Sequence, residues 1–270
     1  MTAGARVEAV GVLTGWGEGV ESLPADARTA ALGRSVIPLD RPALDGERFR
    51  RATRECLLGV VAVEAMLRDA GIDRETIRGP GTALIFVTAA AYGASNVEWL
   101  AGRAGTLHFP YTAPSVLPGE VAIEFGLTGP YVILIGGPTA TIDGLWQVGR
   151  LLAEGRCQRA LVLALETFAE CEALWRRARW ALPGPMVESA ACALIGPGDT
   201  VPAYRPAAAP SPLEGVVEAR AGRTLACAPL LALALAREAG RREALVSGTW
   251  RGRTAAIDID LAVAARSGRM

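Results

Sequence analysis

The chain contains no lysine, and all 28 of its basic residues are arginines. This absence excludes Schiff-base chemistry and a lysine acting as a catalytic base. The single histidine, His108, excludes a histidine-rich metal site and leaves one possible base for a cysteine or serine nucleophile. A net charge of zero provides no overall field that would favour nucleic acid. We therefore expect no metal, no cofactor and no nucleic-acid partner.

Paired cysteines and long apolar runs are also missing. The five cysteines are scattered, without a CxxC motif or a pairing rhythm, which fits a reducing cytosol. No stretch reaches the roughly 20 apolar residues of a membrane span. The first residues contain no apolar signal-peptide core. We expect a cytoplasmic protein with no membrane partner.

The residues that are present predict an α/β fold. With 270 residues and 51% hydrophobic content, the chain can bury one large core or two small ones. Continuous apolar runs alternate with helical patterns, which favours a parallel or mostly parallel sheet covered on both faces. Residues 196–212 are rich in Pro, Gly and Ala and predict a linker. The expected strands are 7–14, 82–89, 131–135, 159–167, 187–195, 244–247 and 255–261, and the expected helices include 49–70, 95–103, 118–126, 170–179 and 224–239.

One stretch, from Gly129 to Asp143, has the pattern of a strand, a tight turn and a helix. The apolar run from Tyr131 to Ile135 stops at Gly136-Gly137, and a helical pattern begins at once. The glycines permit a tight turn, and Pro138 suits the first helical turn. A residue at such a turn lies at a helix N-terminus, where free N–H groups favour a thiolate or an oxyanion. The position suited to a nucleophile is occupied by Pro138, which has no nucleophilic atom.

The stretch resembles the nucleophile turn of the β-ketoacyl synthases, which carry Gly-Pro, a short strand, Thr-Ala-Cys and a helix. Counting from Gly129-Pro130, the active-site cysteine of that family falls on Pro138, and its Thr-Ala falls on Gly136-Gly137. The resemblance implies a thiolase-like layered α/β fold with a complete N-terminal half and a shortened C-terminal half. Other segments that resemble the family in the same order are 51–72, 114–130, 154–166 and 188–195.

The second half resembles the family in two short pieces. Gly222-Arg-Thr-Leu-Ala-Cys227 is similar to the second histidine motif, with Arg223 in place of the histidine. Residues 249–254 are similar to the closing Gly-Phe-Gly-Gly-Thr-Asn turn, with Trp250 at the phenylalanine position. The first catalytic histidine lies in a stretch that is missing here. We expect a ketosynthase-like N-terminal half over 1–196, a linker over 197–221 that replaces the deleted segment, and a remnant of the C-terminal half over 222–270.

The departures from the family imply a chain without catalytic residues or intrinsic activity. Proline cannot carry an acyl group, and a guanidinium cannot act as a base near neutral pH. The chain therefore resembles the chain-length factors, inactive homologues that pair with an active ketosynthase in type II polyketide systems. The resemblance implies a heterodimer that shapes the acyl tunnel during polyketide or polyene elongation, with substrate supplied on an acyl carrier protein. By position, the tunnel or interface residues would be Phe109, Tyr111, Thr112 and Val116, although these residues could equally be ordinary packing residues.

Two alternatives stay open from the sequence. The first is a small-ligand or phosphate-binding α/β enzyme that uses the Gly136-Gly137 turn between strand and helix. It has no GxGxxG motif and no Walker lysine, and Pro138 removes a backbone donor. The second is a ketosynthase-derived scaffold or acyl-carrier docking module, in which Arg176, Arg177 and Arg179 would face an acidic partner.

Overall fold

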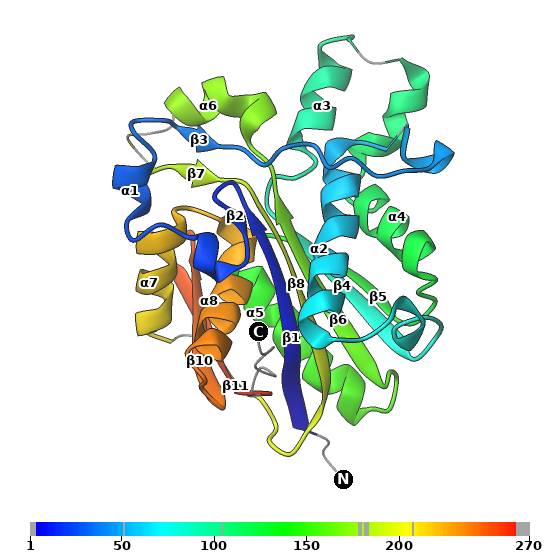
Figure 1. Cartoon of the computed structure of the whole chain (residues 1–270), viewed down its shortest axis with the longest axis vertical. Coiled ribbons are helices and arrows are strands. Elements are labelled where there is room, and N and C mark those ends of the chain that lie inside the picture. Colours follow the sequence, from blue (N-terminus) through cyan, green and yellow to red (C-terminus); the bar gives the residue numbers. More distant parts are fainter. Residues whose placement is uncertain are drawn as a thin grey trace, which may run out of the picture.

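A central mixed sheet with helices on both faces organises the chain (Figure 1). The computed structural model describes residues 4–50, 52–103, 105–177, 180, 184–206 and 208–262, with backbone alone at 94 and 106–108. The strand order in the sheet is β10-β11-β1-β8-β6-β4-β5. These strands are β1 (Gly4–Thr14), β4 (Thr82–Thr88), β5 (Tyr131–Ile135), β6 (Arg159–Glu166), β8 (Ser189–Gly198), β10 (Glu243–Trp250) and β11 (Arg253–Leu261).

Short strands extend this framework. β2 (Gly17–Glu18) pairs with β1, and β9 (Ala203–Arg205) pairs with β11. β3 (Val36–Ile37) and β7 (Met186–Val187) form a separate two-stranded parallel sheet. The short helices and 3-10 turns are η1 (Val20–Ser22), α1 (Ala27–Ala30), η2 (Glu47–Arg50), η3 (Arg74–Thr76), α3 (Gly93–Leu100), η4 (Thr106–Thr112), η5 (Ala169–Cys171), α6 (Glu172–Arg177) and η7 (Leu225–Cys227).

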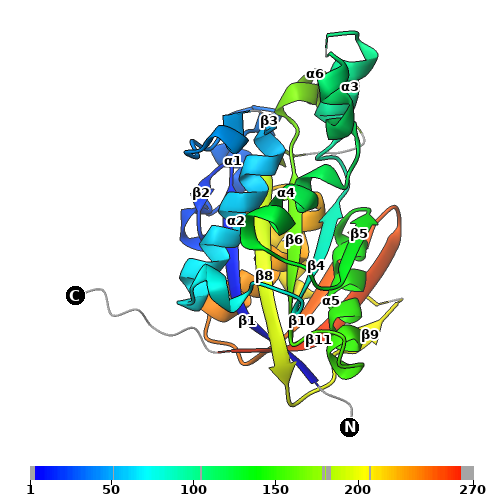
Figure 2. The ribbon, with the colours of Figure 1, turned by 90° about the vertical axis from the view of Figure 1, so that its right-hand side faces the viewer.

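Two helical layers bury both faces of the sheet (Figure 2). α2 (Arg54–Ala70) and α4 (Val116–Phe125) cover one face, and α5 (Pro138–Ala153) and α8 (Ala228–Glu238) cover the other. Alternate residues of β4 divide between the layers, because successive side chains of a strand point to opposite faces. Leu84 and Phe86 pack with α2 and α4, whereas Ile85 and Val87 pack with α5. This two-sided burial explains why the strand sequences are continuously apolar.

The expectation of a parallel or mostly parallel sheet is wrong. β4 runs parallel to β5 and β6, and β1 runs parallel to β11. β8, however, runs antiparallel to both of its neighbours, β1 and β6, and β10 runs antiparallel to β11. A strand covered on both faces is apolar throughout whichever way it runs, so its composition does not reveal its direction.

Several element boundaries differ from the sequence prediction. The helix expected from residue 49 begins at Arg54, and residue 95 lies inside α3 instead of capping it. Residues 197–221 are not irregular throughout, because they contain β9 and the helix α7 (Pro212–Ala221). The Ser211 side chain caps α7 by accepting a hydrogen bond from the Glu214 N–H at 3.4 Å, and Pro212 occupies the first turn. The sequence prediction assigned Ser211 and Pro212 to a linker, whereas the structure places them at the start of a helix.

The C-terminal segment is built into the same sheet and core as the first half. β11 pairs with β1, with Val7 opposite Leu261. Arg237 of α8 is 5% exposed, forms an ion pair with Asp69 of α2 and donates to the Glu8 carbonyl at 2.8 Å. None of the helices in the described part of the chain has the length and apolar composition that crossing a membrane requires.

The Arg237 contacts predict that the two halves unfold together. We expect Arg237→Ala to lower the free energy of unfolding by roughly 2 kcal/mol, because it removes the cation paired with Asp69 and the side-chain donor to the Glu8 carbonyl. Arg241→Ala, at an exposed site after the same helix, serves as the control and should change little. Urea unfolding followed by circular dichroism measures both values. Two separate transitions in the wild-type chain would contradict a shared core.

Candidate functional site

The strand, turn and helix predicted around residue 138 are present. β5 ends at Ile135, Gly137 takes the N-cap position, and Pro138 is the first residue of α5. The Gly136 N–H donates to the Thr88 carbonyl at 2.9 Å, which ties the turn to the neighbouring strand β4. Pro138 is buried. The turn therefore presents residue 138 at a helix N-terminus, but the side chain there is a pyrrolidine ring.

Three residues that are far apart in the sequence line one pocket of about 260 Å³: Pro138, Arg223 and Trp250. The resemblance had placed the family's cysteine, second histidine and closing phenylalanine at these positions, and the structure brings the three together. None of the three side chains is a nucleophile or a base at neutral pH. The rest of the lining comes from Glu214, Val217, Glu218, Gly222, Thr224, Leu225, Ala228 and Thr249.

Two carboxylates of α7 face this pocket, and sequence reasoning missed both. Glu218 forms an ion pair with Arg223 at 3.3 Å. Glu214 accepts hydrogen bonds from the Thr249 N–H at 2.9 Å and from the Ser247 hydroxyl at 2.5 Å. The pattern Ser211-x-x-Glu214, which is typical of a capping box at a helix start, could have indicated the helix on which both residues lie.

A third carboxyl group, Glu166 at the end of β6, lies buried between the residues that follow β4 and the segment that follows Arg223. Its side chain is 0% exposed and accepts hydrogen bonds from the N–H groups of Ala89 at 2.7 Å, Ala90 at 2.9 Å and Ala226 at 3.2 Å. Burial outweighs these hydrogen bonds and raises the pKa of Glu166 to about 8. The Ala226 carbonyl in turn accepts from the Thr141 hydroxyl of α5 at 2.6 Å. Glu166 thus links three segments that surround the site.

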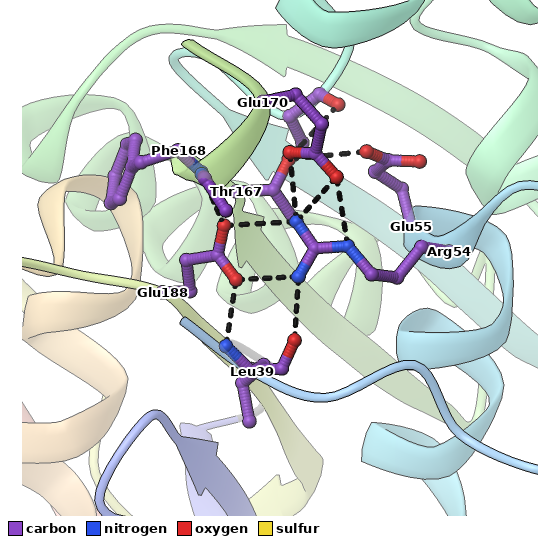
Figure 3. Close-up of polar contacts among 9 residues, drawn as sticks. Leu39, Arg54, Glu55, Thr167, Phe168, Glu170 and Glu188 are labelled. Atoms are coloured by element: carbon purple, nitrogen blue, oxygen red, sulfur yellow. Dashed lines mark hydrogen bonds and ion pairs between the residues drawn. The ribbon is translucent and has the colours of Figure 1, made fainter. Parts of the chain in front are cut away.

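A buried ion pair joins further segments beside the site (Figure 3). Arg54 at the start of α2 lies 2.5 Å from Glu188, which is 0% exposed, and 2.7 Å from Glu170. Glu188 also accepts hydrogen bonds from the N–H groups of Leu39 at 2.7 Å and Phe168 at 2.6 Å. Burial alone would raise the pKa of Glu188, but the hydrogen bonds and charge of Arg54 outweigh it and lower the pKa.

The four residues expected to line a tunnel lie in two different environments. Tyr111 and Val116 line a cavity of about 20 Å³ together with the buried Glu55, which leaves space for about one water molecule. Phe109 is 58% exposed and lies against Trp99, with ring centroids 5.2 Å apart. The Thr112 hydroxyl donates to the Phe109 carbonyl at 2.7 Å. The side chain of the neighbouring histidine, residue 108, lies outside the described part.

The structure does not support phosphate binding at the Gly136-Gly137 turn. A Cβ atom placed on Gly137 would lie 2.4 Å from the Trp250 ring, so the indole covers the turn. Pro138 removes the N–H group that would face a phosphate there.

Within the described residues, no cluster of His, Cys, Asp and Glu is placed to hold a metal ion. Of the arginine patch, residues 176 and 177 are exposed at the end of α6, and residue 179 lies outside the described part.

Glu166 predicts a pH dependence of stability. Its folded pKa of about 8 exceeds the ordinary 4.5, so its contribution is complete below pH 4.5 and is lost as the pH rises through 8. Relative to Glu166→Gln, the wild-type free energy of unfolding should fall by about 1 kcal/mol per pH unit in that window. Urea unfolding at pH 5, 7 and 9 measures this difference. The same pH dependence of the unfolding free energy in both proteins would contradict the raised pKa of Glu166.

The comparisons with known proteins point to one family. The sequence profile described as "Beta-ketoacyl synthase, N-terminal domain" matches residues 41–193, which is more than half of the chain. No curated protein sequence matches the chain.

Solved structures are similar in fold at low identity. "The ishigamide ketosynthase/chain length factor" has a TM-score of 0.72 and 16% identity, and the match covers 96% of this chain and 100% of that chain. "AntDE:AntF (apo): type II PKS acyl-carrier protein in complex with its ketosynthase bound to the hexaketide" has a TM-score of 0.73 and 12% identity, with 96% and 99% covered. A "Ketosynthase (ApeO) in Complex with its Chain Length Factor (ApeC) from Xenorhabdus doucetiae" has a TM-score of 0.61 and 14% identity, with 96% and 98% covered.

These structures share a thiolase-like ketosynthase fold, to which the layered α/β sheet of this chain conforms. The profile match covers β4, the turn at residue 138 and the first half of β8, whereas Arg223 and Trp250 lie outside it. The chain belongs to the β-ketoacyl synthase family.

Proposed function

We propose that the chain is a non-catalytic, chain-length-factor-like subunit that pairs with an active ketosynthase and shapes the acyl tunnel during polyketide or polyene elongation. The observation that carries the proposal is the convergence of Pro138, Arg223 and Trp250 on one pocket. The family framework around them is retained, while the positions that would carry acyl transfer hold side chains that cannot perform it. A subunit of this kind leaves the chemistry to its partner. The cytoplasmic location is proposed from the unpaired cysteines.

The edge of the sheet supports a protein partner. β5 is the last strand of the sheet, so one side of its backbone has no neighbouring strand among the described residues. Tyr131 and Ile135 at its two ends are 42% and 50% exposed, and Ile123 of α4 is 68% exposed. An exposed apolar edge strand favours pairing with another chain. The similar structures whose titles join a ketosynthase to a chain length factor support an active ketosynthase as this partner.

The small cavity lined by Tyr111 and Val116 supports a role for this segment as a tunnel wall. Tyr111 and Val116 close a space of about 20 Å³, which is too small for an acyl chain. A tunnel at the interface with the partner would therefore run past these side chains, and their size would limit the length of the acyl chain. Phe109 and Thr112 would lie at the surface of the same segment. The complex of an acyl carrier protein with a hexaketide-bound ketosynthase supports delivery of substrate on a carrier protein.

The proposed function also accounts for the shortened C-terminal half of the chain. Residues 197–221, with β9 and α7, would stand in place of the longer family segment that carries the first catalytic histidine, and residues 222–270 would be the remnant of the C-terminal half. The α7 carboxylates Glu214 and Glu218 then line the space that faces Arg223. A scaffold or carrier-docking role remains the second candidate, supported by the exposed Arg176 and Arg177 on α6.

Co-expression with a full-length ketosynthase tests the partnership. Size-exclusion chromatography with mass determination should give a one-to-one complex. Ile135→Asp should abolish it, because the substitution places a charge on the apolar edge strand. Leu245→Asp is the matched control, since Leu245 is a 37% exposed residue on β10, at the opposite edge of the sheet. A stable monomer with every ketosynthase offered would refute the proposal, and binding of a carrier protein by the chain alone would favour the scaffold.

The tunnel is tested separately by Tyr111→Ala in the complex. Removing the phenol ring enlarges the cavity that Tyr111 and Val116 close, so we expect products longer by at least one extension unit. Mass spectrometry of the products measures their length. Tyr204→Ala, which removes a phenol ring that packs on Trp146 of α5, away from the Tyr111 segment, is the control and should leave the length unchanged. Products of unchanged length from both variants would contradict a role for Tyr111 in the tunnel wall.

A further inference from the structure

The small cavity that Tyr111 and Val116 close is polar over part of its wall. The side chains that bring oxygen atoms to its lining, besides Tyr111, are Thr53, Glu55, Thr88, Tyr92 and Ser95. A volume of about 20 Å³ with polar partners around it suits one hydrogen-bonded water molecule. An acyl chain that ended at this wall would therefore meet hydrogen-bonding groups as well as apolar ones.

Glu55 is the one carboxyl group among the described residues of this lining. It lies in the first turn of α2, where an acidic side chain is normally exposed, yet it is only 7% exposed. Its carboxyl group accepts a hydrogen bond from the Thr167 hydroxyl at 3.3 Å. Burying a carboxyl group costs free energy unless it has hydrogen-bonding partners. A hydrogen-bonding group of the acyl chain, or a water molecule in the cavity, would supply a further partner.

The charges around Glu55 favour its neutral form (Figure 3). Arg54 lies 2.5 Å from Glu188 and 2.7 Å from Glu170, so its single positive charge is already shared between two carboxylates. Burial first, and then the charge of Glu170, raise the pKa of Glu55, and Arg54 opposes this only in part. A neutral carboxylic acid can donate a hydrogen bond as well as accept one.

We propose that Glu55 makes the end of the tunnel selective for acyl chains whose far end carries a carbonyl oxygen, over chains with a hydrocarbon end. A ketone oxygen can accept a hydrogen bond from the Glu55 carboxyl group, directly or through the one water molecule that the cavity can hold. A hydrocarbon end would cover the same polar wall and leave its groups without a partner. The inference rests on the proposed function and deepens it by naming the substrate class, a poly-β-keto chain and not a polyene.

Competition between matched acyl chains tests this selectivity in the complex with the active ketosynthase. Each pair of carrier-bound thioesters has equal length, and one member ends in a methyl ketone and the other in an alkyl group. Both are extended by a malonyl carrier thioester with loss of carbon dioxide, and mass spectrometry measures the two products. At the longest length that the wild type extends, we expect the ketone to be preferred roughly tenfold. Short pairs should show no preference, because they do not reach the wall.

Variants at residue 55 assign the preference to its side chain. Glu55→Met is apolar and of similar length, so the preference should fall to about twofold or less, whereas Glu55→Gln can still donate a hydrogen bond and should keep most of it. Glu75→Leu is the control, because Glu75 on η3 has a 74% exposed side chain, and it should keep the wild-type ratio. If Glu55→Met does not fold, Glu55→Ala needs no additional space and should show the same loss.

Equal extension of both chains by the wild type at the longest length would overturn the inference. A wild-type ratio in Glu55→Met or Glu55→Ala would overturn it as well. These results would leave the partnership with a ketosynthase intact, since the complex would still form and elongate. Failure to form any complex would refute the proposed function, and with it the tunnel in which Glu55 would act.

Discussion

The buried pair of Arg54 and Glu188 is the interaction on which the arrangement of the site depends. Taking both charges out of water costs several kcal/mol, and the pair is stable only because hydrogen bonds satisfy the rest of the carboxylate. Those bonds come from Leu39 and Phe168, and Arg54 also holds Glu170, so one pair joins the start of α2, the residues after β6, the start of β8 and the loop before α2. The end of β6 then carries Glu166, which fixes the backbone on both sides of the site.

This framework surrounds three positions whose side chains are neither nucleophiles nor bases at neutral pH. Pro138, Arg223 and Trp250 meet at one pocket, and the buried carboxylates beside them are engaged in structural hydrogen bonds. None of the side chains of Pro138, Arg223 and Trp250 can carry an acyl group as a cysteine thiolate does. The exposed strand β5 at one edge of the sheet and the Tyr111 cavity next to β4 are where the proposed function would be performed.

The sequence was sufficient for features whose signal is local. The turn at residue 138 could be predicted because its glycines and proline have a defined backbone role, and the resemblance placed Arg223 and Trp250 before the structure brought them together. Strand direction could not be predicted, because two-sided burial makes parallel and antiparallel strands equally apolar. Helix α7 was missed because Ser211 and Pro212 also suit a loop. The contact of Trp250 with Gly137 depends on tertiary packing between distant segments, which no local pattern encodes.

The central claim is that the chain contributes to elongation without performing it. The most direct measurement is a reconstituted elongation assay with an active ketosynthase, an acyl carrier protein and a malonyl thioester, in which product is quantified with and without this chain. The account predicts product of full length only when both proteins are present, and none when the partner lacks its nucleophilic cysteine. Condensation by this chain alone, or equal elongation by the ketosynthase without it, would contradict the account.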